Sequence, residues 1–152
     1  MTMTQLKQRS ATPADLEACM IIRGQTRDNP ISPQVLAEYG VTTANWTPLL
    51  QNQEIIGSVL EDKKHIVAFT FADTKSAEIL VVAILPDYEN QGLGKKLLNK
   101  MVEKLKTLGH KRMWLAAAPD PEMRAYGFYR HLGWTSTGKL DEHGDEVLEL
   151  LV

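Results

Sequence analysis

Hydrophobic and polar positions follow two alternating patterns along the chain, and together they predict a mixed α/β protein. Short runs of mostly apolar residues alternate with segments in which apolar residues recur every three or four positions. The first pattern predicts strands over residues 4–10, 54–60, 65–71, 79–85 and 111–118, with a final hairpin over 134–152 that turns at His143-Gly144. The second predicts helices over residues 13–27, 93–108 and 122–132, with two short helices in 32–51 separated by Gly40.

The segment around residues 84–98 combines a strand, a glycine turn and a helix. Residues 79–85 are continuously apolar, which is typical of a central strand covered on both faces. Gly92 and Gly94 follow, and an amphipathic helix begins directly after them. The glycines allow a ligand to approach the backbone, while the free N–H groups and the dipole of the helix favour an anion. The segment therefore predicts a cradle for a pyrophosphate.

Specific residues exclude two common nucleotide-binding motifs. A dinucleotide fingerprint requires a third glycine where this chain has Leu97, which also disfavours a nicotinamide or flavin oxidoreductase. A P-loop requires glycine at the position of Glu89 and Ser or Thr after its lysine, where the chain has Lys96.

Two segments resemble the GNAT superfamily of N-acetyltransferases. The run ENQGLG at residues 89–94 resembles its motif A, Gln/Arg-x-x-Gly-x-Gly/Ala, with Glu89 at the first position. The run AYGFYRHLGW at residues 125–134 resembles its A-x-x-F-Y-x-x-x-G-F segment, with Trp134 in place of the last Phe. The resemblance implies a GNAT fold of the α/β (α+β) class, in one domain over residues 1–152. Its central mixed, mostly antiparallel sheet would have six to seven strands flanked by about four helices. We expect the acidic side chain of Glu89 to turn toward solvent.

The resemblance also implies acetyl-CoA as the acetyl donor and an amine that attacks the thioester directly. In this superfamily, backbone N–H groups of the glycine turn hold the pyrophosphate, and here these belong to Gln91, Gly92, Leu93, Gly94, Lys95 and Lys96. A backbone N–H of the preceding strand polarises the thioester carbonyl. By position this group belongs to Ile84, with Ala83 and Leu85 adjacent.

Tyr129 matches the tyrosine with which the superfamily assists the departing thiolate. Its helical spacing directs it inward with the apolar residues of the same helix, where a hydroxyl needs a partner. The other interpretation is a core tyrosine bonded to a carbonyl group, and Tyr126 is the second candidate for the role.

Two glutamates are candidates for the general base that deprotonates the amine. Glu78 lies 14 residues before Gly92, the offset of the catalytic glutamate in the histone-acetyltransferase branch of the superfamily. The other interpretation of Glu78 is a polar residue at the start of a strand. Glu122, where the superfamily has a cofactor-contacting Asn, is a weaker candidate.

The acceptor is open between a small-molecule amine and a protein N-terminus. Residues 28–53 resemble nothing specific, and Tyr39 and Trp46 within them are candidates for the wall of an acceptor pocket. Glu89, Glu122 and Ala116 depart from common patterns of the superfamily. These departures leave open an alternative function, a non-catalytic acyl-CoA-binding sensor or partner subunit.

Composition argues against several other classes of function. The 152 residues carry a net charge of −2, which argues against nucleic-acid binding. No apolar run approaches the roughly 20 residues of a membrane span, and the first residues lack a signal-peptide core. The single cysteine, Cys19, lies on an apolar helix face, is expected in the core and fits the reducing cytoplasm. The four histidines have no metal-like spacing, so no metal is expected. A homodimer supported by the C-terminal strand EVLELLV is compatible with the superfamily.

Overall fold

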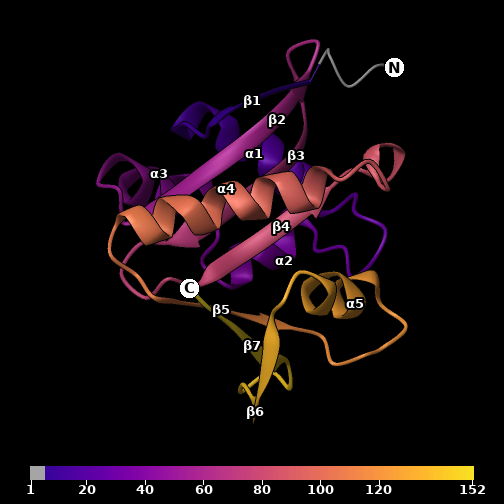
Figure 1. Ribbon diagram of the computed structural model, residues 1–152. Coiled ribbons are helices and arrows are strands. Elements are labelled where there is room, and N and C mark those ends of the chain that lie inside the picture. The colour runs from indigo at the N-terminus through magenta and orange to yellow at the C-terminus, as the bar shows by residue number, and fades with distance from the viewer. Residues whose placement is uncertain (1–5) are drawn as a thin grey trace.

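The computed structural model describes residues 6–152, in which seven strands form two antiparallel sheets accompanied by five α-helices (Figure 1). The larger sheet has the order β1-β2-β3-β4, with bounds Leu6–Ser10, Ile55–Asp62, His65–Asp73 and Ile79–Ile84. The smaller sheet has the order β5-β7-β6, with bounds Arg112–Ala117, Glu146–Leu151 and Thr135–Leu140. The predicted fold class is confirmed. The first strand begins at Leu6, and the predicted positions 4 and 5 lie outside the described residues.

The strands divide into two sheets because β4 bends away from β5. Phe71 pairs with Val81 and Ala72 pairs with Ile79, so Leu80 has no residue opposite it in the ladder. Such a bulge bends and twists a strand. Within the described residues, backbone pairing between these segments is confined to the start of β4, where Glu78, directly before the strand, forms an isolated bridge with Trp114 of β5, and the strands diverge beyond it (Figure 1).

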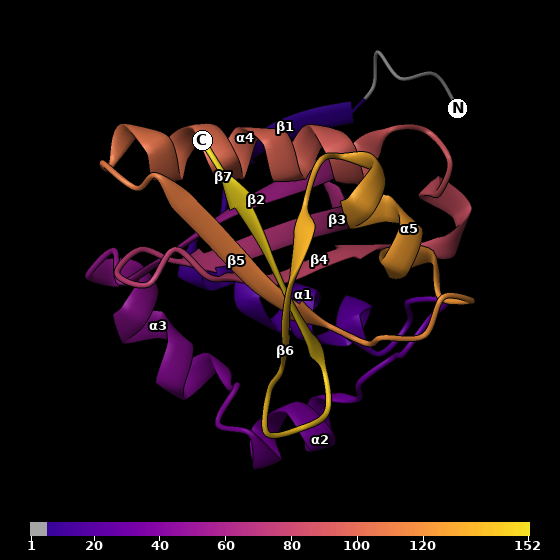
Figure 2. The ribbon, with the colours of Figure 1, turned by 60° about the horizontal axis from the view of Figure 1, so that its bottom comes forward.

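Helices cover both faces of the larger sheet, as Figure 2 shows. One face carries α4 (Leu93–Thr107), whose apolar stripe is fully buried. The opposite face carries α1 (Leu16–Arg23), α2 (Pro33–Glu38) and α3 (Thr43–Gln51). The last helix, α5 (Arg124–His131), contributes Tyr129 to a core shared with α4 and the smaller sheet.

Two details of the secondary structure differ from the prediction. The helix predicted over residues 13–27 begins as a 3₁₀ turn at Pro13–Asp15 and ends at Arg23. It ends early because Ile31 N–H returns to bond the Arg23 carbonyl at 3.1 Å, which folds the intervening loop back onto the helix end. The C-terminal strand β7 is paired on both sides, so it has no free edge for a partner's strand. A homodimer stays a prediction.

Candidate functional site

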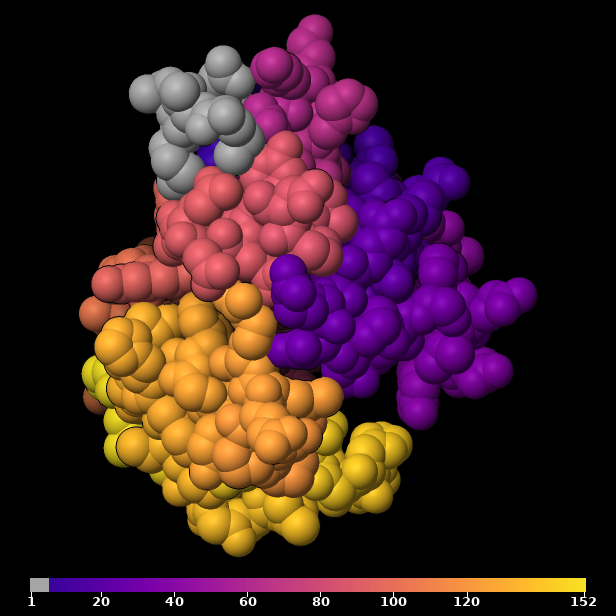
Figure 3. All heavy atoms as spheres, turned by 90° about the vertical axis from the view of Figure 1, so that its right-hand side faces the viewer, coloured from indigo at the N-terminus to yellow at the C-terminus, as the bar shows by residue number. Residues whose placement is uncertain are grey.

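The divergence of β4 and β5 opens a cavity of about 440 Å³. Its walls are β4, the loop before α4, the first turn of α4, β5, α5 and the segment after α1. In Figure 3 the salmon loop before α4, the orange segment around α5 and the indigo segment after α1 lie against one another on this side of the molecule. Residues far apart in the sequence therefore share one site.

The first turn of α4 presents unpaired backbone donors to this cavity. Gly92 caps the helix with φ of 76°, a left-handed conformation that favours glycine. The N–H groups of Leu93, Gly94 and Lys95 have no acceptor in the described part of the chain, and all three residues line the cavity. Lys96 N–H donates to the Gly92 carbonyl at 3.1 Å. The structure thus brings the predicted Gly92, Leu93, Gly94 and Lys95 to the cavity.

Two other predicted members of this turn lie outside the cavity wall. Gln91 and Lys96 are exposed and do not line the cavity. The N–H of Lys96 is already used within the helix, because it is the first N–H that can reach a carbonyl of the turn.

Gly94 lets α4 approach its neighbours closely. A Cβ atom at this position would lie 3.0 Å from Ile84 Cδ1 and 3.1 Å from Phe128 Cζ. A side chain would force these neighbours or the first turn of α4 to shift, because both contacts are tighter than ordinary van der Waals distances. Glycine at this position therefore sets the distance between the free N–H groups and the open strand.

Along β4, successive backbone N–H groups point alternately toward β3 and toward the cavity at the free edge of the strand. Leu85 N–H donates to the Val67 carbonyl at 3.0 Å, so it points toward β3. Ala83 pairs with Phe69 in the same ladder and faces the same way. Ile84 then faces the opposite edge, toward the cavity that it lines. Of the three predicted residues Ala83, Ile84 and Leu85, Ile84 alone directs its N–H group to the cavity.

Tyr129 lies in the wall of the cavity with its ring held by aromatic neighbours. Its residue is 8% exposed, and its ring centroid lies 5.0 Å from that of Phe128 and 6.1 Å from that of Trp134. Burial raises the pKa of Tyr129 to about 12, and the nearby Arg23 guanidinium opposes that shift. The hydroxyl has no hydrogen-bond partner among residues 6–152 and is not fully buried, so it is available to a ligand in the cavity.

The other acid–base candidates lie outside the cavity wall. Glu78 is half-buried directly before β4; burial, and then Asp73 and Asp141, raise the pKa of its carboxyl above the ordinary value. Tyr126 is covered by the Arg130 guanidinium, 3.6 Å above its ring, and Glu122 is exposed.

The expectation that the Glu89 side chain turns toward solvent is wrong. The side chain is 10% exposed and accepts from Arg27 Nε at 2.7 Å, and Arg124 Nε lies 3.1 Å from its other oxygen. Arg124 also donates to Asn90 Oδ1 at 3.0 Å, and its N–H donates to Asp28 Oδ2 at 3.1 Å. These contacts join three segments at the mouth of the cavity. No local pattern indicated these contacts, because the partners lie far apart along the chain.

A second, apolar cavity of about 220 Å³ lies between β3, β4 and the helices of the opposite face. Arg23, Leu80 and Val81 line both cavities, so the two spaces meet at β4. Trp46 lines the second cavity, whereas Tyr39 is 66% exposed, packs against His143 and lines neither cavity. Sequence reasoning missed Arg23, whose one signal was a charged residue directly after the apolar run of residues 18–22.

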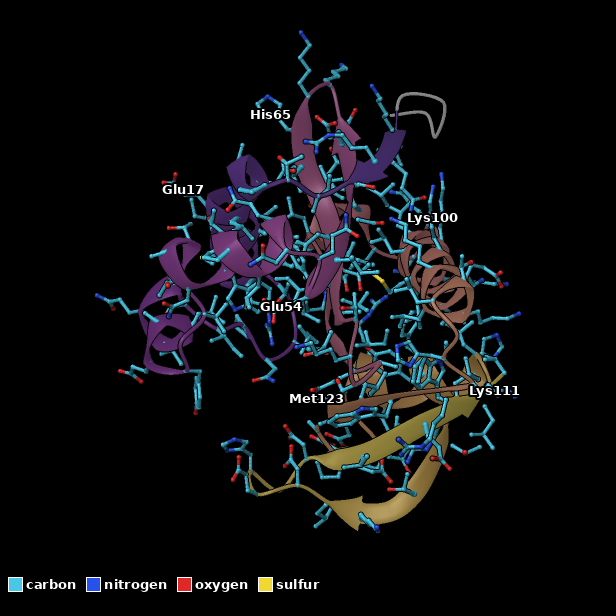
Figure 4. All side chains as sticks on the ribbon, turned by 90° about the vertical axis from the view of Figure 1, so that its left-hand side faces the viewer. Glu17, Glu54, His65, Lys100, Lys111 and Met123 are labelled. Atoms are coloured by element: carbon cyan, nitrogen blue, oxygen red, sulfur yellow. The ribbon has the colours of Figure 1, made fainter. Side chains whose placement is uncertain are left out.

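Residues 6–152 contain no group of three metal-ligating side chains. In Figure 4 the labelled His65 lies at the β2–β3 turn, far from Met123 at the start of α5. Cys19 is buried in the core as predicted, and burial raises the pKa of its thiol to about 12. No helix in the described part of the chain has the length and apolar character needed to cross a membrane.

The sequence matches a family of acetyltransferases, described as the acetyltransferase (GNAT) family, over residues 15–134. No protein with a curated function matches it. The fold is similar to that of PaiA N-acetyltransferase from Thermoplasma acidophilum in complex with coenzyme A, with a TM-score of 0.81 and 16% identity over all of both chains. It is similar to YncA from Salmonella typhimurium with its cofactor acetyl-CoA, with a TM-score of 0.76 and 18% identity over 97% of this chain and 94% of that one. The ribosomal-protein-S18-alanine N-acetyltransferase from Escherichia coli has a TM-score of 0.71 and 22% identity, again over 97% and 94%.

Proposed function

The chain belongs to the acetyltransferase (GNAT) family, and from that premise we propose that it transfers an acetyl group from acetyl-CoA to a primary amine, as one domain over residues 1–152. The acceptor is an amine of a small molecule or of a protein. The observation that carries the proposal is the row of unpaired N–H groups at Leu93, Gly94 and Lys95, which faces the cavity between β4 and β5.

The residues of this cavity fit the chemistry of coenzyme A. Its pyrophosphate is an anion, and the free N–H groups at the start of a helix are favourable partners for one. Its pantetheine arm carries amides, which suit the free backbone edge of β4. The paired Glu89 adds no uncompensated negative charge, because two arginines hold its carboxylate. The departure from the family pattern at this position therefore leaves the cradle intact.

Acetyl-CoA, when bound, supplies the acetyl group in the activated form of a thioester. Ile84 N–H donates a hydrogen bond to the carbonyl oxygen as negative charge develops on it. The Tyr129 hydroxyl donates to the departing sulfur. With a pKa of about 12 the phenol is a weaker acid than a thiol near ~8.5, so it stabilises the thiolate by hydrogen bonding and keeps its proton.

Glu78 is the base in this proposal and acts on the amine through water, because its side chain is not among those that line the cavity. Burial and two neighbouring carboxylates raise the pKa of Glu78, which brings it closer to the working pH than an ordinary carboxyl. A base with a pKa nearer the working pH accepts a proton more effectively in the transition state.

The test is release of free thiol from acetyl-CoA in the presence of a panel of amines, including amino acids, polyamines and peptides with free N-termini. The proposal predicts release that depends on an amine and falls sharply in Tyr129→Phe. Binding of acetyl-CoA without amine-dependent release would instead indicate the alternative, a non-catalytic acyl-CoA-binding sensor or partner subunit. Absence of binding would refute both.

A further inference from the structure

The second cavity lies on the other side of β4 from the first cavity, in which we place acetyl-CoA. The two cavities meet at Arg23, Leu80 and Val81, which line both spaces. An acceptor bound in the second cavity can therefore reach the acetyl group. Apart from Arg23, the wall of the second cavity consists of apolar side chains such as Met20, Trp46 and Phe71, and it contains no carboxylate. A wall without carboxylates does not suit the positively charged chain of a polyamine.

The volume of this cavity fits one apolar side chain. It measures about 220 Å³, which is below the roughly 300–1,000 Å³ of cavities that hold drug-sized ligands. An apolar cavity of roughly 150 Å³ is enough to hold benzene. The space therefore suits a branched aliphatic chain or a single aromatic ring.

Arg23 differs from the other arginines of the chain. Five of the six arginines form ion pairs with carboxylates, and they are Arg9, Arg27, Arg112, Arg124 and Arg130. Arg23 has no carboxylate partner within residues 6–152, although it is half-buried and burial lowers its pKa. A guanidinium charge in such surroundings is costly unless it finds an anion.

The guanidinium of Arg23 has donors left over for such an anion. Its Nη1 donates to the Asn29 carbonyl at 2.7 Å and to Thr26 Oγ1 at 3.4 Å. Its Nε and Nη2 have no acceptor in the described part of the chain. This edge of a guanidinium forms two parallel hydrogen bonds with a carboxylate.

We propose that the acceptor is an α-amino acid with an apolar side chain, whose carboxylate binds Arg23 and whose side chain fills the second cavity. This inference rests on the proposed function. The α-nitrogen forms a bond to the acetyl carbon, and the carbon–sulfur bond breaks with its electron pair passing to sulfur. One proton lost by the nitrogen is balanced by one proton taken up by the thiolate or by solvent. The products are an N-acetylated amino acid and a free thiol.

The test measures binding of pairs of compounds that differ only in the carboxylate. Calorimetric titrations in excess CoA compare L-leucine with isoamylamine, and L-phenylalanine with phenethylamine. A charge-assisted pair of hydrogen bonds predicts that each amino acid binds roughly 10- to 100-fold more tightly than its amine. In Arg23→Met this preference disappears and the two members of each pair bind alike.

Two further variants serve as controls. Arg112→Met removes an arginine whose partner, Glu149, lies on the smaller sheet, and it leaves the preference unchanged. Arg23→Lys retains the positive charge but cannot form the double hydrogen bond, so it loses most of the preference. Thermal unfolding of each variant identifies any loss of folding.

The outcomes separate this inference from the proposed function. Acetyl-CoA is titrated alone in the same experiment. If it binds while neither amino acid outbinds its amine, the inference is wrong and the proposed function stands. If the amino acids retain their preference in Arg23→Met, Arg23 is not the carboxylate site. If acetyl-CoA does not bind at all, the proposed function falls, whatever the amino acids do.

Discussion

Replacing Tyr129 with phenylalanine removes one hydroxyl and leaves the ring in its aromatic cluster. The structure predicts a small effect on stability and a large one on catalysis. The residue is 8% exposed, and its hydroxyl has no hydrogen-bond partner within residues 6–152. The hydroxyl borders the open cavity and is not among the buried polar atoms that lack a partner, so its removal relieves little desolvation penalty.

The free energy of unfolding of Tyr129→Phe should therefore change little. We expect a change within about 0.5 kcal/mol, which shifts Tm by less than roughly 2 °C in a chain of this size. The rate of acetyl transfer should fall. A hydrogen bond to a charged group contributes about 1.5–3 kcal/mol, which corresponds to a roughly 10- to 150-fold decrease in kcat.

The assay combines thermal unfolding, calorimetric titration of acetyl-CoA and steady-state thiol release with the best amine of the panel. The Kd of acetyl-CoA should change little, because the ring and the backbone cradle remain. A kcat that falls less than about threefold would refute the role of the hydroxyl at the departing sulfur. A decrease in Tm of more than about 4 °C would show that the hydroxyl has a partner inside the fold.

Four further perturbations test separate parts of the site. Gly94→Ala crowds Ile84, lowers acetyl-CoA affinity at least about tenfold and destabilises the fold by a net of about 0.5–2 kcal/mol. The control is Gly127→Ala, whose Cβ meets nothing within 4 Å; it stabilises by about 0.5–1 kcal/mol and leaves the affinity unchanged. Glu89→Gln releases two half-exposed arginines and lowers the free energy of unfolding by about 1 kcal/mol, an effect that shrinks at high salt. In Glu78→Gln, the rise of kcat/KM with pH, which in the wild type follows a pKa above the ordinary carboxyl value, disappears. The native Cys19 thiol, with a pKa of about 12, does not react with Ellman's reagent at neutral pH until the protein unfolds.

The sign of the pH effect at Glu78 also extends to stability. Its pKa is raised in the folded protein, so the folded state binds the proton more tightly than the unfolded state. The stabilisation from Glu78 is present at low pH and is lost as pH rises through the folded pKa. Glu78→Gln should remove this part of the pH dependence, and an unchanged unfolding profile would contradict the assigned pKa shift.

Each of the other three perturbations also has a result that would contradict its physical reason. Unchanged acetyl-CoA affinity in Gly94→Ala would show that the spacing of α4 and β4 does not matter for binding. A Glu89→Gln variant as stable as the wild type at low salt would show that its ion pairs contribute nothing. Rapid labelling of native Cys19 would show that α1 opens readily.

Local sequence patterns predicted most of the elements, because the signals were strong and close together. The glycines at 92 and 94, followed by an apolar stripe, placed the start of α4 where the structure has it. The final hairpin and the buried strand before the glycine turn were predicted in the same way. These features depend on residues within one element, which the sequence displays directly.

Features that depend on pairing between distant segments were not predicted. The bulge at Leu80 depends on the register between β3 and β4, and it turns one expected sheet into two. The buried position of Glu89 depends on Arg27 and Arg124, which join it only after folding. The position of Arg23 between two cavities depends on where α1 ends, and the loop that returns to its carbonyl sets that end.

Thermal unfolding with and without acetyl-CoA tests the central claim most directly. At about 100 times Kd, a ligand that binds only the folded state raises the free energy of unfolding by about 2.7 kcal/mol, or Tm by roughly 5–10 °C. We expect this shift with acetyl-CoA and a smaller one with ADP, which carries a pyrophosphate but no pantetheine arm. No shift with millimolar acetyl-CoA would contradict the cradle at the start of α4, and the assignment as an acetyltransferase would fall with it.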